Sequence, residues 1–129
     1  MTPDEVDALA DRFFAAIERG DVEAVAAYYH PDVRVWHNYD QLDQEREANL
    51  AVLAWLGRHV EGLRYEDVRR DIVADGFVQQ HVLRGATESG EPLEVPAMMR
   101  VTLRDGLIVR IEEYLDTAQT EALRTRRPR

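Results

Sequence analysis

The stretch DGFVQQHVLR, residues 75–84, decides the fold, because it joins a hairpin turn to a strand with an unusual inner face. Asp75-Gly76 is a typical turn signal between two antiparallel strands. In the strand that follows, side chains two positions apart point to the same face. One face therefore places an amide and an imidazole between two large hydrophobic residues: Phe77, Gln79, His81 and Leu83. Burial of such polar groups is costly unless they are paired or hydrated, so this strand indicates a polar pocket inside a small sheet.

The stretch LIVRIEEYL, residues 107–115, has the same form and predicts the last strand. One of its faces carries a carboxylate among apolar side chains, with the order Leu107, Val109, Ile111, Glu113 and Leu115. We expect Glu113 and His81 to point into one shared hollow, because each lies on a face that otherwise reads as core.

Two further strands complete the second half of the chain, over residues 63–74 and 93–103, with turn signals at Ser89-Gly90 and Asp105-Gly106. Alternation in residues 63–74 is imperfect, which predicts a bulge. These strands form an antiparallel meander joined by hairpins.

The first half is mainly helical. Thr2 and Glu5 predict a capping box that begins a helix ending at Gly20, and Asp21 is expected to cap a second helix that stops at His30-Pro31. A strand over residues 33–38 follows, and Asp43 is expected to cap a third helix that ends between Gly57 and Gly62. Asp116 is expected to cap a short terminal helix. This order predicts an α+β domain in which a curved antiparallel sheet wraps around three helices, with a cavity inside the cup.

Composition limits the class of protein. The chain has 129 residues, which fits a single domain over residues 1–129, and its net charge of −9 argues against nucleic acid as a partner. No cysteine is present, which excludes disulfides and thiolate metal sites, and we expect neither metal nor cofactor. No signal peptide and no apolar run near the roughly 20 residues of a membrane helix is visible, so we expect a cytoplasmic protein without a membrane contact. The basic tail, residues 124–129, is expected to be frayed.

The chain resembles the nuclear transport factor 2-like superfamily, whose members include ketosteroid isomerases, limonene epoxide hydrolases and SnoaL-like polyketide cyclases. The resemblance is carried by the order of elements and by three short segments: Glu18-Arg19-Gly20-Asp21, His30-Pro31-Asp32-Val33, and Arg104-Asp105-Gly106 followed by Glu113-Tyr114-Leu115-Asp116. It implies a cone-shaped α+β barrel, but not an activity, because one fold hosts many functions.

Individual positions separate the activities within that family. Phe13 stands where the isomerases place an oxyanion-binding Tyr, and Asn38 stands where they place a carboxylate base, so isomerisation by their mechanism is not expected. The epoxide hydrolases place an aromatic residue and an Asn where this chain has Trp36 and Asn38. In place of their Arg and Asp on a middle strand it has Gln79 and His81, and in place of their Asp on the last strand it has Glu113.

The candidate site follows from these positions. His81 and Glu113 are predicted as a catalytic acid–base pair, in which Glu113 either orients the imidazole or is itself the acid. Substrate contacts are expected from Asn38 and Gln79, which can hold an oxygen atom, from the flat wall of Trp36 and from Asp40 at the mouth of the pocket. His37 is expected to face away from the cavity, because it alternates with Trp36.

Three functions remain open on the sequence. The first is a cofactor-independent isomerase, cyclase or hydrolase that acts on a small apolar organic molecule. The second is a protein that binds such a molecule without converting it, and the third is a dimeric interaction module in which the polar groups only satisfy each other. The outer sheet face mixes apolar and charged residues, with one row formed by Val78, Gln80, Val82 and Arg84 and another by Ile108, Arg110, Glu112 and Tyr114. We expect this face to form a homodimer.

Overall fold

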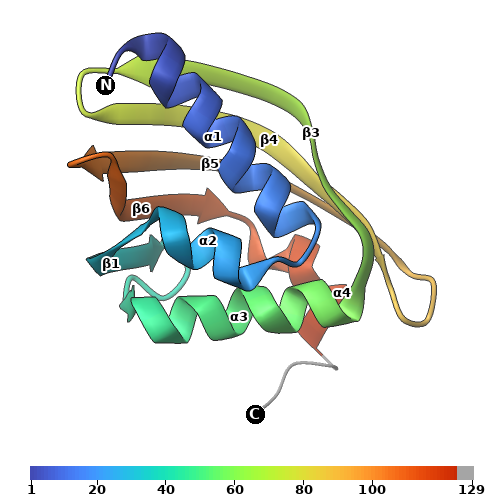
Figure 1. Ribbon diagram of the computed structural model, residues 1–129. Coiled ribbons are helices and arrows are strands. Elements are labelled where there is room, and N and C mark those ends of the chain that lie inside the picture. The colour runs from blue at the N-terminus through green and yellow to red at the C-terminus, as the bar shows by residue number, and fades with distance from the viewer. Residues whose placement is uncertain (125–129) are drawn as a thin grey trace.

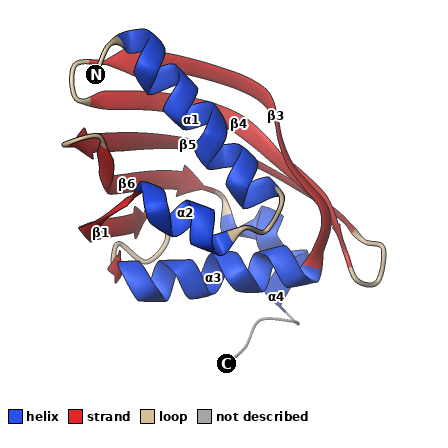
Figure 2. Cartoon of the chain, viewed as in Figure 1, coloured by secondary structure: helices blue, strands red, loops and turns tan. Residues whose placement is uncertain are grey.

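Helices cover one face of a strongly curved sheet in the computed structural model, which describes residues 1–124 (Figures 1 and 2). In chain order the elements are α1 Pro3–Glu18, α2 Val22–Tyr28, β1 Tyr29–His37, β2 Asp43–Glu45, α3 Arg46–His59, β3 Val60–Val73, β4 Gly76–Thr87, β5 Pro92–Arg104, β6 Leu107–Leu115, a 3-10 turn Thr117–Thr120 and α4 Glu121–Arg124. The predicted α+β cone is confirmed. Side chains of the tail residues 124–129 lie outside the described part of the structure.

The first two helices begin as the sequence predicts. Thr2 accepts a hydrogen bond from the Glu5 backbone while Glu5 accepts one from the Thr2 backbone, which completes the capping box. The Asp21 side chain caps α2. The prediction for the third helix is wrong in detail, because Asp43 lies in the short strand β2 and α3 begins after Glu45 without a side-chain cap.

The sheet has the strand order β2-β1-β6-β5-β4-β3. Neighbours are antiparallel except β1 and β6, which run parallel, so the sheet is mixed at this one junction. The predicted irregularity of β3 is confirmed by register shifts between Glu61 and Arg64 and between Glu66 and Arg69. Such bulges bend a strand, and β3 and β4 sweep around the end of α1 in Figure 1.

The parallel junction of β1 and β6 sets the register of the site. His37 faces Glu113 directly across these two strands, and the Asn38 backbone donates to the carbonyl of Glu113. The predicted inner face of β6 holds for Ile111, Glu113 and Leu115, which line the interior. It is wrong at the start of the strand, where Ile108 is fully buried and not on the outer face, next to a register shift in the pairing with β5.

The core fills the space between the helices and the concave face of the sheet. Its most deeply buried side chains include Phe13 of α1, Phe77 of β4 and Val101 of β5. None of the helices in the described part of the chain is long and apolar enough to cross a membrane.

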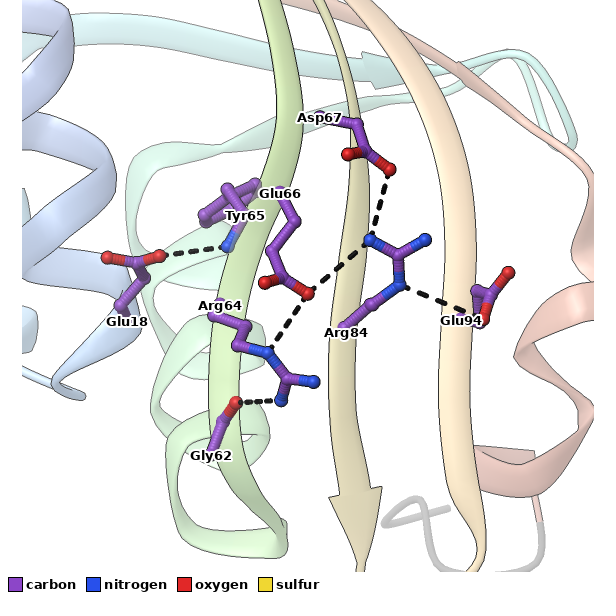
Figure 3. Close-up of polar contacts among 8 residues, drawn as sticks. All are labelled: Glu18, Gly62, Arg64, Tyr65, Glu66, Asp67, Arg84 and Glu94. Atoms are coloured by element: carbon purple, nitrogen blue, oxygen red, sulfur yellow. Dashed lines mark hydrogen bonds and ion pairs between the residues drawn. The ribbon is translucent and has the colours of Figure 1, made fainter.

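The convex face of the sheet carries charges beside exposed apolar side chains. Figure 3 shows Arg84 of β4 between three carboxylates, with ion pairs to Glu66 and Asp67 of β3 and to Glu94 of β5. Further along this face, Met98 and Tyr114 are about half exposed, at 47% and 54%. The mixed character that the sequence predicts for this face is confirmed for these residues.

Candidate functional site

A cavity of about 470 Å³ lies between the helices and the concave face of the sheet. Its wall is mostly apolar and includes Phe14, Leu53, Val95 and Met99. Polar side chains interrupt that wall, among them Tyr29, His37, Gln44, Asn49, His81 and Glu113. A largely apolar hollow with a few convergent polar groups is the usual form of a small-molecule site.

His81 and Glu113 both line this cavity, so the predicted shared hollow exists. The direct partner of Glu113 is a different imidazole, however. Nε2 of His37 lies 3.0 Å from Oε1 of Glu113, with the two side chains only 11% and 19% exposed. The expectation that His37 faces away from the cavity is therefore wrong.

The second ring nitrogen of His37 indicates which group donates in the His37–Glu113 contact. Nδ1 of His37 is buried without a hydrogen-bond partner in the described structure. In the neutral ring, the proton on Nε2 is donated to the carboxylate and Nδ1 keeps a lone pair. The Tyr39 ring covers this imidazole, with centroids 5.1 Å apart. We read His37 as a group that holds Glu113, whereas Glu113 itself lines the cavity.

His81 is held by Gln79 instead of by a carboxylate. Nε2 of Gln79 lies 2.9 Å from Nδ1 of His81, and both residues are buried. The rings of Tyr65 and Phe14 pack edge-on against the imidazole, with centroids 4.7 and 5.9 Å away. Burial lowers the pKa of His81, with a smaller contribution from Arg70, while Glu113 partly opposes this effect. The imidazole is accordingly neutral at pH 7, since its ordinary value is 6.5.

A second set of polar side chains, joined by hydrogen bonds, lies on the cavity wall between β1 and α3. The Tyr29 hydroxyl donates to Oδ1 of Asn49 over 2.7 Å, and Nδ2 of Asn49 donates to Gln44 over 3.1 Å. Burial, with the nearby charge of Glu113, raises the pKa of Tyr29, and the same causes raise the pKa of Tyr65. Both phenols therefore stay protonated near neutral pH, and that of Tyr29 donates to Asn49.

The remaining predicted site residues lie away from the cavity wall. Trp36 points to the convex face, where its ring packs against Tyr114 at 5.4 Å. Asn38 uses its amide to bind both backbone groups of Leu115, and Asp40 accepts a hydrogen bond from the Leu42 backbone in an exposed turn. Gln79 lies behind His81 and does not belong to the wall. Placement of Trp36 inside the cavity was wrong by one residue of strand phase.

Sequence reasoning missed His37, Tyr29 and Asn49. The signal for His37 was present in the row Val33, Val35 and His37, which alternates toward the interior as the burial of all three confirms. The resemblance to the epoxide hydrolases instead favours the other row, Trp36 and Asn38, which matches their pattern. Tyr29 and Asn49 carried no comparable signal, because their contact joins residues 20 positions apart.

Comparison with solved structures gives the same fold. A "putative polyketide cyclase" from Xanthomonas campestris pv. campestris matches 92% of this chain and 96% of its own, with a TM-score of 0.79 and 20% identity. AclR, a "putative hydroxylase" from Streptomyces galilaeus, matches 98% of this chain and 100% of its own, with a TM-score of 0.83 and 12% identity. A "Putative Isomerase" from Bacillus subtilis covers 90% of this chain and 89% of its own, with a TM-score of 0.77 and 14% identity.

These identities are too low to carry more than the architecture. No curated protein matches the sequence. The family model for the SnoaL-like domain matches residues 10–111, which include His37 and His81 but end within β6, before Glu113. The chain therefore belongs to the SnoaL-like family.

Proposed function

We propose that this protein binds a small, mostly apolar organic molecule in the inner cavity and catalyses a proton transfer on it without a cofactor. The observation that carries the proposal is the carboxylate of Glu113 on a mostly apolar wall, fixed by His37 at 3.0 Å and facing the same hollow as a neutral imidazole. The cavity volume of about 470 Å³ falls within the range of small-ligand sites.

Glu113 is the group that moves the proton. A carboxylate held by an N–H donor is oriented for one lone-pair direction, and the apolar surroundings exclude water that would compete for it. His37 is a positioning residue, since its Nε2 contacts the carboxylate and its Nδ1 is covered.

His81 supplies the complementary role. A neutral imidazole can donate one hydrogen bond to an oxygen atom on which negative charge develops, as an oxyanion-binding group does. Removal of a proton from carbon next to a carbonyl, or addition of a held water or hydroxyl, fits this pair of groups. These steps correspond to the isomerase, cyclase and hydrolase reactions that the sequence left open.

Binding without conversion is the second candidate. The wall is favourable for an apolar ligand whatever its chemistry, and the polar contacts of His37 and His81 would also satisfy a static site. Catalysis is favoured because Glu113 keeps a position on the cavity wall instead of being enclosed by donors on all sides.

The convex face supports a further proposal, that two copies of the chain associate through it. It presents Met98 and Tyr114 at 47% and 54% exposure, beside charges of both signs. A two-fold axis brings unlike charges of the same surface together, and apolar side chains at the centre of such a surface stabilise a homodimer.

The decisive experiment combines a thermal-shift screen of small ketones, lactones and epoxides with product analysis by mass spectrometry. Glu113→Gln is expected to lower turnover of any converted compound by about 10²–10⁴-fold while ligand binding persists. Glu112→Gln is the matched control, because Glu112 lies beside Arg110 on the convex side and leaves turnover unchanged. Full turnover by Glu113→Gln would overturn the assignment, and saturable binding with no product for any ligand would support the binding protein instead.

A further inference from the structure

We propose that Arg70 and Gln79 lock His81 in the tautomer with its proton on Nε2, so that the cavity offers a fixed hydrogen-bond donor to an uncharged oxygen acceptor, most simply a ketone carbonyl, on the ligand. The ligand half of this inference rests on the proposed function, whereas the tautomer is a property of the protein alone.

The chain of contacts begins at the outer end of Arg70. Nη1 of this guanidinium donates to Asp7 over 2.7 Å and to Asp11 over 2.8 Å, and both carboxylates belong to α1. A guanidinium can only donate hydrogen bonds. The Arg70 side chain is only 10% exposed, and its Nε donates to Oε1 of Gln79 over 2.8 Å. Two carboxylates thus hold the guanidinium at one end while the other end points at the amide.

Arg70 decides which way the Gln79 amide faces. A guanidinium has only donors, so the carbonyl oxygen of Gln79 must face it, and the NH₂ group must face the opposite way. Gln79 is fully buried, so water cannot replace either partner if the amide turns. Rotation of the amide would turn its NH₂ group toward the N–H of Arg70, so that two donors face each other and both are left buried without an acceptor.

The orientation of Gln79 then decides the tautomer of His81. The Gln79 NH₂ group donates to Nδ1 of His81 at 2.9 Å, so Nδ1 must be the acceptor. The proton of the neutral ring is therefore on Nε2. Within the described residues no group accepts a hydrogen bond from Nε2, and His81 lines the cavity.

Groups around His81 also disfavour a second proton. Glu113 from β6 attracts the charged form, whereas Arg70 from β3 repels it and the rings of Tyr65 and Phe14 exclude water. A proton on Nδ1 would in addition point at the NH₂ group of Gln79, as two donors facing each other. His81 thus serves as a donor and not as the base that its residue type first implies.

A donor of this kind selects the ligand. A single N–H in an apolar cavity binds an oxygen acceptor and leaves a cationic or donor-only group unsatisfied. When Glu113 removes a proton from the carbon next to a carbonyl, the C–H electron pair forms a C=C bond and the carbonyl π pair moves to the oxygen. That oxygen becomes an enolate oxygen, which accepts a hydrogen bond from Nε2 of His81. Glu113 carries the proton, so the step balances without a further reactant.

The tautomer is tested by two-bond ¹H–¹⁵N spectra of the ¹⁵N-labelled protein between pH 6 and 8, with the His81 signals identified by their loss in His81→Gln. Wild type is expected to show the pyrrole-type shift at Nε2 and the pyridine-type shift at Nδ1. Gln79→Glu places an acceptor against Nδ1, so the proton should move to Nδ1 or the ring should become charged. Gln80→Glu, one residue along and on the exposed face, is the control and should leave the His81 signals unchanged.

The spectra separate failure of this inference from failure of the proposed function. A proton on Nδ1 in wild type, or unchanged His81 signals in a folded Gln79→Glu variant, would overturn the lock. Arg70→Met is the second variant, and it should produce a mixture of tautomers because it frees the amide to turn. The ligand half is tested with 2-decalone against 2-methylenedecalin: a His81 Nε2 shift at saturation with the ketone alone supports it, and equal effects of the two compounds or no shift with either overturn it while the tautomer result stands.

Discussion

His37 and Glu113 occupy facing positions on adjacent parallel strands, with Nε2 and Oε1 3.0 Å apart. The contact is fixed by the backbone as well as by the side chains, because the amide next in the chain donates to the carbonyl of Glu113. Parallel pairing of β1 and β6 therefore sets the position of Glu113, the one carboxylate that lines the cavity among the described residues.

This contact predicts a measurable coupling between the two side chains. His37→Leu and Glu113→Leu should each destabilise the protein, since each leaves the partner buried without its hydrogen bond. The double variant should cost less than the sum, with a coupling of about 1–3 kcal/mol in urea unfolding. Additive effects would show that the contact contributes nothing to stability. The exposed pair Arg64 and Glu66 is the control and should show a coupling below about 1 kcal/mol.

The predictable part of the fold lies in local signals. The hairpin at Asp75-Gly76, the capping box of Thr2 and Glu5 and the cap at Asp21 are specified by residues within a few positions of each other, and all are found. The α+β cone follows from their order. What local signals do not contain is the partner of a strand: nothing within residues 29–37 indicates that this segment pairs in parallel with β6, which begins only at Leu107.

The candidate site shows the same division. Glu113 and His81 were found because a polar residue broke an apolar row on one strand, and both line the cavity. Their partners could not be found in this way. Gln79 was expected to contact the ligand and is instead enclosed between Arg70 and His81, because the orientation of an amide depends on a guanidinium from another strand. Trp36 was misplaced since a shift of one residue moves every side chain of a strand to the other face.

The burial of His81 predicts a dependence of stability on pH. The folded pKa lies below the ordinary value of 6.5, so the unfolded chain binds the proton first as the pH falls. Well above pH 6.5 this group does not change the free energy of unfolding. As the pH falls from 6.5 through the pKa of the folded state, protonation of His81 in the unfolded chain progressively lowers the free energy of unfolding. Denaturant unfolding at pH 7.5 and pH 5.5 should show a smaller loss in His81→Gln than in wild type. His30→Gln, in the outer part of β1, should retain the His81 contribution, and an equal loss in His81→Gln and wild type would contradict the prediction.

Gly76 predicts a steric limit at the hairpin between β3 and β4. A Cβ added at this position would lie 1.9 Å from the carbonyl oxygen of Val101, which is backbone of the neighbouring strand β5 and cannot move aside. Gly76→Ala should therefore lower the free energy of unfolding by about 3 kcal/mol or more, as a severe clash in a packed sheet does. Gly90→Ala is the matched control, because its Cβ meets nothing within 4 Å and only its φ of +83° is unfavourable for alanine. It should cost about 1 kcal/mol in thermal or denaturant unfolding. Equal costs at the two positions would contradict the steric account.

The convex face predicts an assembly that depends on Met98 and Tyr114. These side chains are exposed beside Trp36, whose ring packs on Tyr114, and an open hollow between them is lined by Arg69, Val82 and Pro96. Met98→Glu places a charge at the centre of this surface, where a second copy would have to bury it. Wild type is expected to sediment as a dimer at micromolar concentration, and the variant as a monomer. Leu42→Glu changes an equally apolar residue that is 65% exposed in the turn before β2, and should leave the dimer intact. Wild type that sediments as a monomer, or a dimer that tolerates Met98→Glu and Tyr114→Glu together, would show that copies associate elsewhere or not at all.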